Sequence, residues 1–340
     1  MIRRIEKARK EKSKQNSKKY PHLNKFIHRV EIEYDNAIKA VEQKYQQTND
    51  KAKAEHQRTY ALAEIEKIQA KEIFIKFSQT ERRLHTNFVR LPSYLLAYLR
   101  IDGYPLHEMD ISNSQPFFVI ALFRPTPEIE QVIREYLGES YIMYIKSLKA
   151  FEREDVKRYI SLVTSGEFYE YMTKKFQDHG IPVSDRKEIK ELLFTTVFFG
   201  NVYAHKFKKD GKLTKGAKAA RLFRKEFPTV YRLFYRIKKE EKNRLAILLQ
   251  RIEAYTMLEC VVKRIEQEIP DMPILTRHDS ILPFYHKFSI TENHLTKTQE
   301  IMVNTIHQVI GVRPQGRMRK YVDRTFLFNE SQTLTRNLYT

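Results

Sequence analysis

Residues 107–118 read HEMDISNSQPFF, and the interpretation of the whole chain starts from this segment. Asp110 stands inside a short apolar run, small polar residues follow it, and a longer apolar run begins at Pro116. This order is typical of a β-strand that ends and leads into a helix, with the acid exposed at the junction. Because an aspartate before an apolar run is most often only a helix N-cap, the segment needs support from elsewhere in the chain.

That support comes from a second acid, Asp279, in the segment ILTRHDSIL. Two short apolar runs flank a polar centre there, which predicts a tight β-hairpin with Asp279 at its tip. Between the two acids, a helix capped by Ser184 or Asp185 is expected to carry Arg186 and Lys190 on one face, one turn apart. An acid, a cationic helix and a second acid, in this order, are the parts that a template-directed nucleotide polymerase needs.

The composition points to a folded protein that binds nucleic acid. The 340 residues include 62 Lys and Arg against 42 Asp and Glu, which gives a formal net charge of +20. With 41% hydrophobic and 12% aromatic residues, the chain is too apolar for a disordered basic tail. A single cysteine, Cys260, excludes an intramolecular disulfide framework and a cysteine-based zinc site. Nine glycines and no tryptophan indicate a mainly helical fold with few tight turns.

Neither a signal peptide nor a membrane span is predicted. The N-terminus is charged and no apolar run follows it, and no segment approaches the roughly 18 apolar residues that a span requires. We therefore expect a soluble, intracellular, cytoplasmic protein without a membrane partner.

The apolar spacing predicts helices along most of the chain. Two long helices, at about 23–47 and 51–77, are expected to form an antiparallel hairpin that is basic on its outer face, and a generic arm for a protein partner is the alternative interpretation. Further helices are expected at about 116–123, 128–137, 152–165, 166–179, 218–240, 243–269 and 296–310, with a polar turn at 78–87 and basic segments at 1–20, 206–217 and 313–319.

These segments resemble the palm and fingers motifs of family A DNA polymerases and of their relatives, the phage-type single-subunit RNA polymerases. Asp110-Ile111-Ser112 is similar to the first catalytic motif, an Asp-x-Ser pattern on the first palm strand. Arg186 and Lys190, followed by an aromatic-rich run, resemble the nucleotide-binding fingers helix. His278-Asp279-Ser280 resembles the third motif.

The resemblance, which covers about residues 80–290, implies a fold. The expected fold class is α+β and mainly helical: a right-hand polymerase with a small antiparallel palm sheet, helical fingers and a helical-hairpin thumb. The expected parts are a basic N-terminal segment with the thumb-like hairpin at 1–80, the first part of the palm at 81–125, the fingers-like helical region at 126–242, and the second part of the palm with the C-terminal helix at 243–340.

The resemblance also implies the site. Two Mg²⁺ ions about 3.5–4 Å apart, for which Mn²⁺ can substitute, activate a 3′-hydroxyl and stabilise the leaving oxygens. The catalytic residues are then Asp110 and Asp279, and the metal residues are Asp110, Asp279 and Ile111. A nucleoside triphosphate is expected to bind Arg186, Lys190, Phe194, Phe198, Phe199, Gln115 and Ile111. A DNA or RNA primer–template is expected to contact Arg83, Thr86, Gln250 and His278.

Two departures from the family pattern bear on the product. Gln115, five residues after Asp110, stands where the DNA enzymes have a bulky Glu that crowds a ribose 2′-hydroxyl and the RNA enzymes have Gly. Ser280 replaces the Glu of the DNA enzymes, as in many RNA enzymes. Gln115 favours dNTPs through a direct steric mechanism, so DNA synthesis is the preferred prediction.

A third departure lies in the aromatic run. From Lys190 to Gly200 it is one residue longer than the family's usual spacing, so the run leaves open whether Phe198 or Phe199 stacks on a base. The residues alone also leave three other functions open: a single-subunit DNA-directed RNA polymerase or primase of the same fold, a metal nuclease, and a non-catalytic basic nucleic-acid-binding protein.

Overall fold

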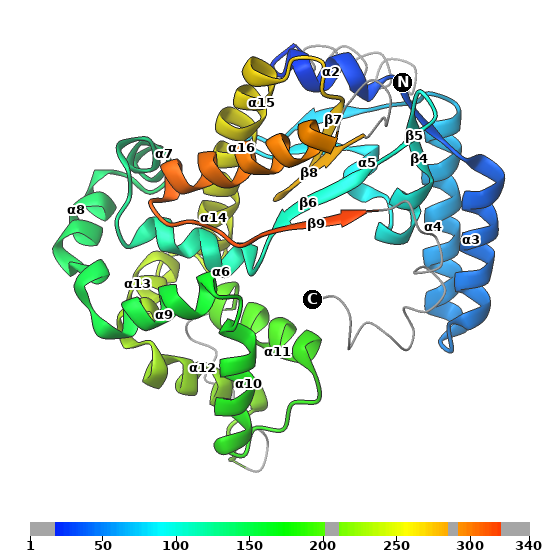
Figure 1. Ribbon diagram of the computed structural model, residues 1–340. Helices are drawn as coiled ribbons and strands as arrows, with labels where there is room; N and C mark the ends of the chain where they lie inside the picture. The colour runs from blue at the N-terminus through cyan, green and yellow to red at the C-terminus, as the bar shows by residue number, and fades with distance from the viewer. Residues whose placement is uncertain (1–17, 201–210, 285–291, 321–340) are drawn as a thin grey trace, which may run out of the picture.

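The computed structural model describes residues 18–200, 211–284 and 292–320 (Figure 1). The fold is α+β and mainly helical, with small antiparallel sheets, as the sequence predicts. The expectations for residues 1–17 and for the part of the basic loop at 206–210 lie outside the described residues. In the described ranges, no helix is both long and apolar enough to cross a membrane.

Nine strands form three antiparallel sheets in the described part of the chain. The strands are β1 (Val30–Ile32), β2 (Ile75–Phe77), β3 (Leu84–Thr86), β4 (Leu99–Ile101), β5 (Tyr104–Pro105), β6 (His107–Ile111), β7 (Ile274–Arg277), β8 (Ser280–Pro283) and β9 (Gly316–Lys320). Their orders are β1-β4-β5, β2-β3 and β7-β8-β6-β9.

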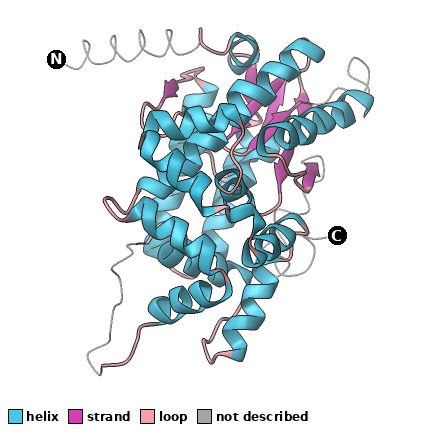
Figure 2. Ribbon diagram, turned by 90° about the vertical axis from the view of Figure 1, so that its left-hand side faces the viewer, coloured by secondary structure: helices cyan, strands magenta, loops and turns pink. Residues whose placement is uncertain are grey.

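Helices make up most of the remaining structure, and Figure 2 shows the strands gathered in the upper part of the molecule with helices around and below them. The α-helices are α2 (Pro21–Ile27), α3 (Tyr34–Gln47), α4 (Lys51–Gln69), α5 (Asn87–Arg90), α6 (Ser114–Val119), α7 (Pro127–Leu137), α8 (Glu139–Leu148), α9 (Glu154–Thr164), α10 (Phe168–Asp178), α11 (Arg186–Leu193), α12 (Lys215–Glu226), α13 (Pro228–Lys238), α14 (Arg244–Ala254), α15 (Lys263–Glu268) and α16 (Glu292–Ile310). The 3₁₀ turns are η1 (Ser93–Tyr98), η2 (Ile120–Leu122) and η3 (Ala150–Glu152), and the π-helical segments are η4 (Phe194–Phe198) and η5 (Tyr255–Val262).

The predicted helical hairpin is present as α3 and α4, which pack against each other on one side of the molecule. Asp50 caps α4 by accepting a hydrogen bond from the Lys53 N–H at 3.1 Å. Both helices are shorter than predicted. The chain forms β1 before α3 and β2 after α4, because residues 30–32 and 75–77 alternate between buried and exposed side chains and pair with β4 and β3. The predicted turn at 78–87 likewise ends in strand β3.

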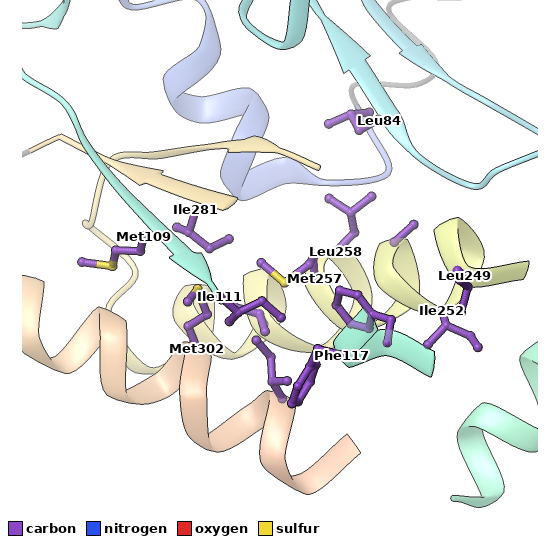
Figure 3. Packing of buried hydrophobic residues seen from close by; sticks show 14 of the residues in the cluster. Leu84, Met109, Ile111, Phe117, Leu249, Ile252, Met257, Leu258, Ile281 and Met302 are labelled. Atoms are coloured by element: carbon purple, nitrogen blue, oxygen red, sulfur yellow. The ribbon is translucent and has the colours of Figure 1, made fainter. Parts of the chain in front are cut away.

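The four-stranded sheet separates an apolar face from a polar face. Met109 and Ile111 on β6 and Ile281 on β8 point from the sheet towards helical residues that include Met302 of α16 and Met257 of η5 (Figure 3). All five side chains are almost completely buried, and burying such a side chain contributes about 1.5–3 kcal/mol to folding. The alternate residues of β6, among them Asp110, therefore lie on the other face of the sheet.

The sequence predicts no helix or strand for the basic segment at 313–319. Its second half is strand β9, which pairs along the whole of β6, from His107 opposite Lys320 to Ile111 opposite Gly316. A Cβ atom on Gly316 would lie 2.8 Å from Val303 Cγ2, so the glycine allows α16 to pack closely beside the strand. Helix α8 was also missed, because only a single residue, Gly138, separates it from α7.

Candidate active site

Strand pairing brings Asp110 and Asp279 to one place in the fold. Met109 of β6 lies directly opposite Ile281 of β8 in the antiparallel sheet. The next residue of β6 is Asp110, and the chain runs back from Ile281 through Ser280 to Asp279 in the turn between β7 and β8. His278, the other residue of this two-residue turn, has a φ of 55°, as hairpin turns of this length require. The predicted strand end and hairpin are therefore both present.

Asp110 is partly buried, which corrects the expectation that the acid is exposed at the end of the strand. Burial, followed by the charges of Asp279 and Glu108, raises the pKa of Asp110 to about 6, and Arg317 and Arg319 oppose this rise. Carboxylates that share a site repel each other, and a cation between them relieves the repulsion. The pair therefore has the charge of a site for a divalent cation.

The donor atoms around this pair are oxygens, the ligands that Mg²⁺ prefers. Ile111 can contribute only its backbone carbonyl, because its apolar side chain is buried in the core. Glu108 is engaged by other groups: its Oε1 accepts a hydrogen bond from Ser280 Oγ at 3.2 Å, and its Oε2 lies 3.6 Å from Arg319 Nη1. Among the described residues no group of three or more His, Cys, Asp or Glu side chains forms a metal site, so the candidate site has two carboxylates.

The cationic helix begins where the sequence predicts. The Asp185 carboxylate accepts a hydrogen bond from the Glu188 N–H at 2.8 Å, and the Glu188 carboxylate accepts one from the Ser184 N–H at 2.7 Å, which together cap α11. Arg186 pairs with Glu170 and donates from Nη2 to Asn113 Oδ1 at 3.1 Å. Since Asn113 lies two residues after the end of β6, this bond ties the start of α11 to the strand end that carries Asp110.

A π-helical turn lies in the aromatic run after Lys190. Residues 194–198 are π-helical, and the Phe199 N–H donates to the Phe194 carbonyl, five residues back, at 2.8 Å. A π turn holds one residue more than an α turn and often occurs at functional sites. The ring centroids of Phe194 and Phe199 lie 5.3 Å apart. The face that carries Arg186 and Lys190 therefore continues through Phe194 to Phe199.

This geometry corrects the expectation for Phe198. Its ring is fully buried among Phe194, Phe199, Phe223 and Phe234, and it offers no face to a base. Phe194 and Phe199 are partly exposed and remain candidates for stacking. Lys190 is exposed, with its Nζ 5.6 Å from the Phe194 ring centroid. The aromatic and cationic groups of α11 and η4 thus form one continuous surface.

Gln115 is held by a buried acid that the sequence did not single out. Its Nε2 donates to Glu253 Oε2 at 2.7 Å, and Arg83 Nη2 lies 2.6 Å from Glu253 Oε1. Burial raises the pKa of Glu253, the ion pair with Arg83 and the hydrogen bond from Gln115 oppose this rise and favour the charged carboxylate, and the charge of Asp279 adds to the rise. Glu253 therefore lies close to both the predicted gate and the predicted metal pair. An acid among the apolar residues of α14 was the available sequence signal.

The predicted nucleic-acid contacts are only partly brought together. Arg83 and His278 are neighbours, since burial, then Arg83, lower the pKa of His278 to about 4. Gln250 lies on α14, three residues before Glu253, and is half-buried. Thr86 ends β3 with only 4% of its surface exposed, which corrects the expectation that its side chain is open to nucleic acid.

Comparison with known proteins does not assign the chain to a family. No protein-family model matches the chain, and no curated protein matches it. Among solved structures, it is similar to the POL domain of Pol1 from M. smegmatis in complex with DNA primer-template and dNTP, with a TM-score of 0.46 and 11% sequence identity over 80% of this chain and 51% of that one. The chain thus spans about half the length of that structure. A likeness with a TM-score below 0.5 supports no conclusion about fold or function.

Proposed function

We propose that the chain is a template-directed nucleic-acid polymerase, a nucleotidyltransferase that uses magnesium and prefers dNTPs. The observation that carries the proposal is the position of two acids relative to the cationic helix. Asp110 and Asp279 lie together where β6 ends and β8 begins, and the Arg186–Asn113 hydrogen bond fixes α11 beside the end of β6. A nucleotide bound along α11 would then lie with its phosphates near the two carboxylates.

The residues around the two carboxylates fit the chemistry of nucleotide addition. Asp110, Asp279 and the Ile111 carbonyl would hold Mg²⁺, with Mn²⁺ as a substitute, and the metal would lower the charge on the phosphates and activate the hydroxyl. In the reaction, the primer 3′-oxygen forms a bond to the α-phosphorus, the bond to pyrophosphate breaks, and the hydroxyl proton passes to solvent.

The chain's own groups would bind and orient the substrates. Lys190 would neutralise phosphate oxygens, and Arg186 would exchange its contact with Glu170 for one to the nucleotide. Phe194 and Phe199 would stack on the incoming base. Arg83, His278 and Gln250 would contact a primer–template bound beside α14.

The domain assignment belongs to the same proposal. Helices α7–α13 gather on one side of the four-stranded sheet and the α3–α4 hairpin lies on the other (Figure 1). This arrangement is consistent with a fingers-like region at 126–242, a thumb-like hairpin within 1–80, and a palm built from 81–125 and 243–340.

DNA synthesis is the first choice, and RNA synthesis is the second. Gln115 is held by Glu253 in a partly buried position, which supports a fixed obstacle to a ribose 2′-hydroxyl. His278-Asp279-Ser280, the form found in many RNA enzymes, supports the alternative. The strongly positive net charge of +20 suits either nucleic acid.

Extension of a labelled primer–template tests the proposal. The reaction contains magnesium and either dNTPs or rNTPs. Asp279→Ala is the inactive variant. Asp271→Ala is the matched control, because it changes an exposed acid that precedes β7, at the other end of that strand from Asp279. Template-dependent extension by the wild type and by Asp271→Ala, but not by Asp279→Ala, is the expected result. If the wild type extends neither primed nor unprimed templates with either nucleotide, the chain is a binding protein and the proposal is wrong.

A further inference from the structure

Glu253 joins two segments that are far apart in the sequence. Its side chain is 1% exposed, and its carboxylate contacts Arg83, 170 residues away, and Gln115, 138 residues away. Arg83 precedes strand β3, whereas Gln115 lies in the first turn of α6, directly after the Asp110 strand. One buried carboxylate therefore fixes two of the side chains that the proposed function places against the substrates.

Packing alone does not explain an acid at this position. A carboxylate that is buried near another acid, as Glu253 is near Asp279, is costly unless good partners compensate for it, and an apolar residue of similar size commonly serves stability as well or better. Leu249 and Ile252 on the same helix are fully buried and fill the core in the ordinary way. The acid at 253 therefore has a role connected with the two groups it holds.

The acid at position 253 also accounts for the amide at position 115. An amide N–H₂ donates to a carboxylate, as Gln115 Nε2 does at 2.7 Å, whereas a glutamate at 115 would place two carboxylates in contact away from water. Gln115 and Glu253 thus form a complementary pair, in which exchanging one side chain alone leaves two like groups facing each other.

We infer that Glu253 is a positioning residue for substrate selection: it holds Gln115 against the sugar of the incoming nucleotide and Arg83 against the primer–template. The inference rests on the proposed function and deepens it. Glu253 itself touches neither substrate and acts through the two side chains that it binds. Removing its charge while keeping its shape would free Gln115 to move aside, so that a ribose 2′-hydroxyl can be accepted.

The test is the selectivity of primer extension, measured as the ratio of kcat/KM for a dNTP to that for the matching rNTP. Because Glu253→Gln loses one charge-assisted hydrogen bond, we expect it to lower this ratio by roughly tenfold. Gln115→Gly provides the reference for a lost gate, and Glu253→Gln should change nothing further in that background. The matched control is Glu259→Gln. Glu259 is a partly buried acid further along the same helical segment, and it pairs with Lys19 and Lys263.

A reciprocal exchange separates positioning from general damage. Gln115→Glu alone places two carboxylates together and is expected to reduce dNTP use, whereas the double variant Gln115→Glu/Glu253→Gln restores one amide and one carboxylate and is expected to recover selectivity. Unfolding midpoints measured for each variant show whether it is folded. Should Glu253→Gln not fold, Gln115→Glu carries the test by itself, and unchanged dNTP use in that variant would overturn the inference.

The outcomes distinguish a failure of the proposed function from a failure of the inference about Glu253. If the wild type extends no primer, the proposed function fails and the inference falls with it. If the wild type extends primers and Glu253→Gln keeps the wild-type selectivity, only the inference is wrong. The inference is supported if Glu253→Gln lowers the dNTP selectivity, the double variant Gln115→Glu/Glu253→Gln restores it, and Glu259→Gln leaves it unchanged.

Discussion

Asp110 of β6 lies directly opposite Arg317 of β9 in the antiparallel ladder. The pairing places a guanidinium beside the carboxyl whose pKa burial and Asp279 raise, and the charge of Arg317 partly offsets that rise. The edge strand β9 therefore takes part in setting the protonation state of the proposed metal ligand.

Removing this cation should shift the pH dependence of synthesis. Arg317→Met takes away a charge that favours the carboxylate, so the pKa of Asp110, about 6 in the wild type, should rise. We expect the pH at which primer extension falls to half its maximum to move upward by roughly 0.5–1 unit, on the scale of a single nearby charge. Arg313→Met is the control, since Arg313 pairs with Asn304 away from the acids. Identical pH profiles for the wild type and Arg317→Met would contradict the assignment.

Asp110→Asn should abolish synthesis and yet stabilise the fold. The pKa of Asp110 is about 6 in the folded chain against an ordinary 3.8, so the folded state binds more protons than the unfolded state between these values, and stability falls as pH rises through this window. An amide avoids that loss, and the free energy of unfolding at pH 7 should increase by on the order of 1–3 kcal/mol.

Urea unfolding measures this effect. The stability difference between Asp110→Asn and the wild type should shrink as the pH falls to about 4, and Asp271→Asn, at an exposed acid, should show no such trend. Because a site built for function carries strain or repulsion that substitution can relieve, a stabilised but inactive variant would support the candidate site. A destabilised Asp110→Asn would argue for a structural role instead.

The sequence predicts those parts of the candidate site whose local structure depends only on residues close to them in the chain. The hairpin at Asp279, the cap at Asp185 and the strand at Asp110 each depend on a short window of polar and apolar residues, and all three are present. The mainly helical fold class followed from composition and apolar spacing in the same way.

Long-range pairing accounts for what the sequence did not predict. Strand β9 lies about 200 residues after β6, and its basic residues indicate a strand only when their partners Asp110 and Glu108 are known. The role of Glu253 likewise depends on Arg83 and Gln115, which α14 meets only in the folded chain. Phe198 is buried for a different reason. α-Helical spacing would place it on the face of Arg186 and Lys190, but residues 194–198 are π-helical.

Lys190 should contribute mainly to nucleotide binding. It is exposed on α11 and free to reach a phosphate, and loss of a charge-assisted contact predicts that Lys190→Ala raises the KM for nucleotide by roughly tenfold or more. Lys157→Ala is the matched control, because Lys157 is an exposed lysine on another helix, α9, where it pairs with Glu154. Titration of extension rate with dNTP concentration measures both. Equal KM values for the two variants would show that the face is only a solvated helix surface.

Phe198 and Phe199 are adjacent in sequence and should respond in opposite ways. Phe198 is fully buried between Phe223 and Phe234, so Phe198→Ala should cost about 3–5 kcal/mol of unfolding free energy, the usual price of a cavity of this size. Phe199→Ala should cost much less, because its ring is partly exposed, but it should raise the KM for nucleotide by removing a stacking surface. Phe199→Tyr keeps a ring and should behave like the wild type. Phe198→Leu refills most of the cavity that Phe198→Ala would leave. If Phe199→Ala leaves the KM for nucleotide unchanged and Phe198→Leu raises that KM, Phe199 is not the stacking residue and the π-helical turn does not select it.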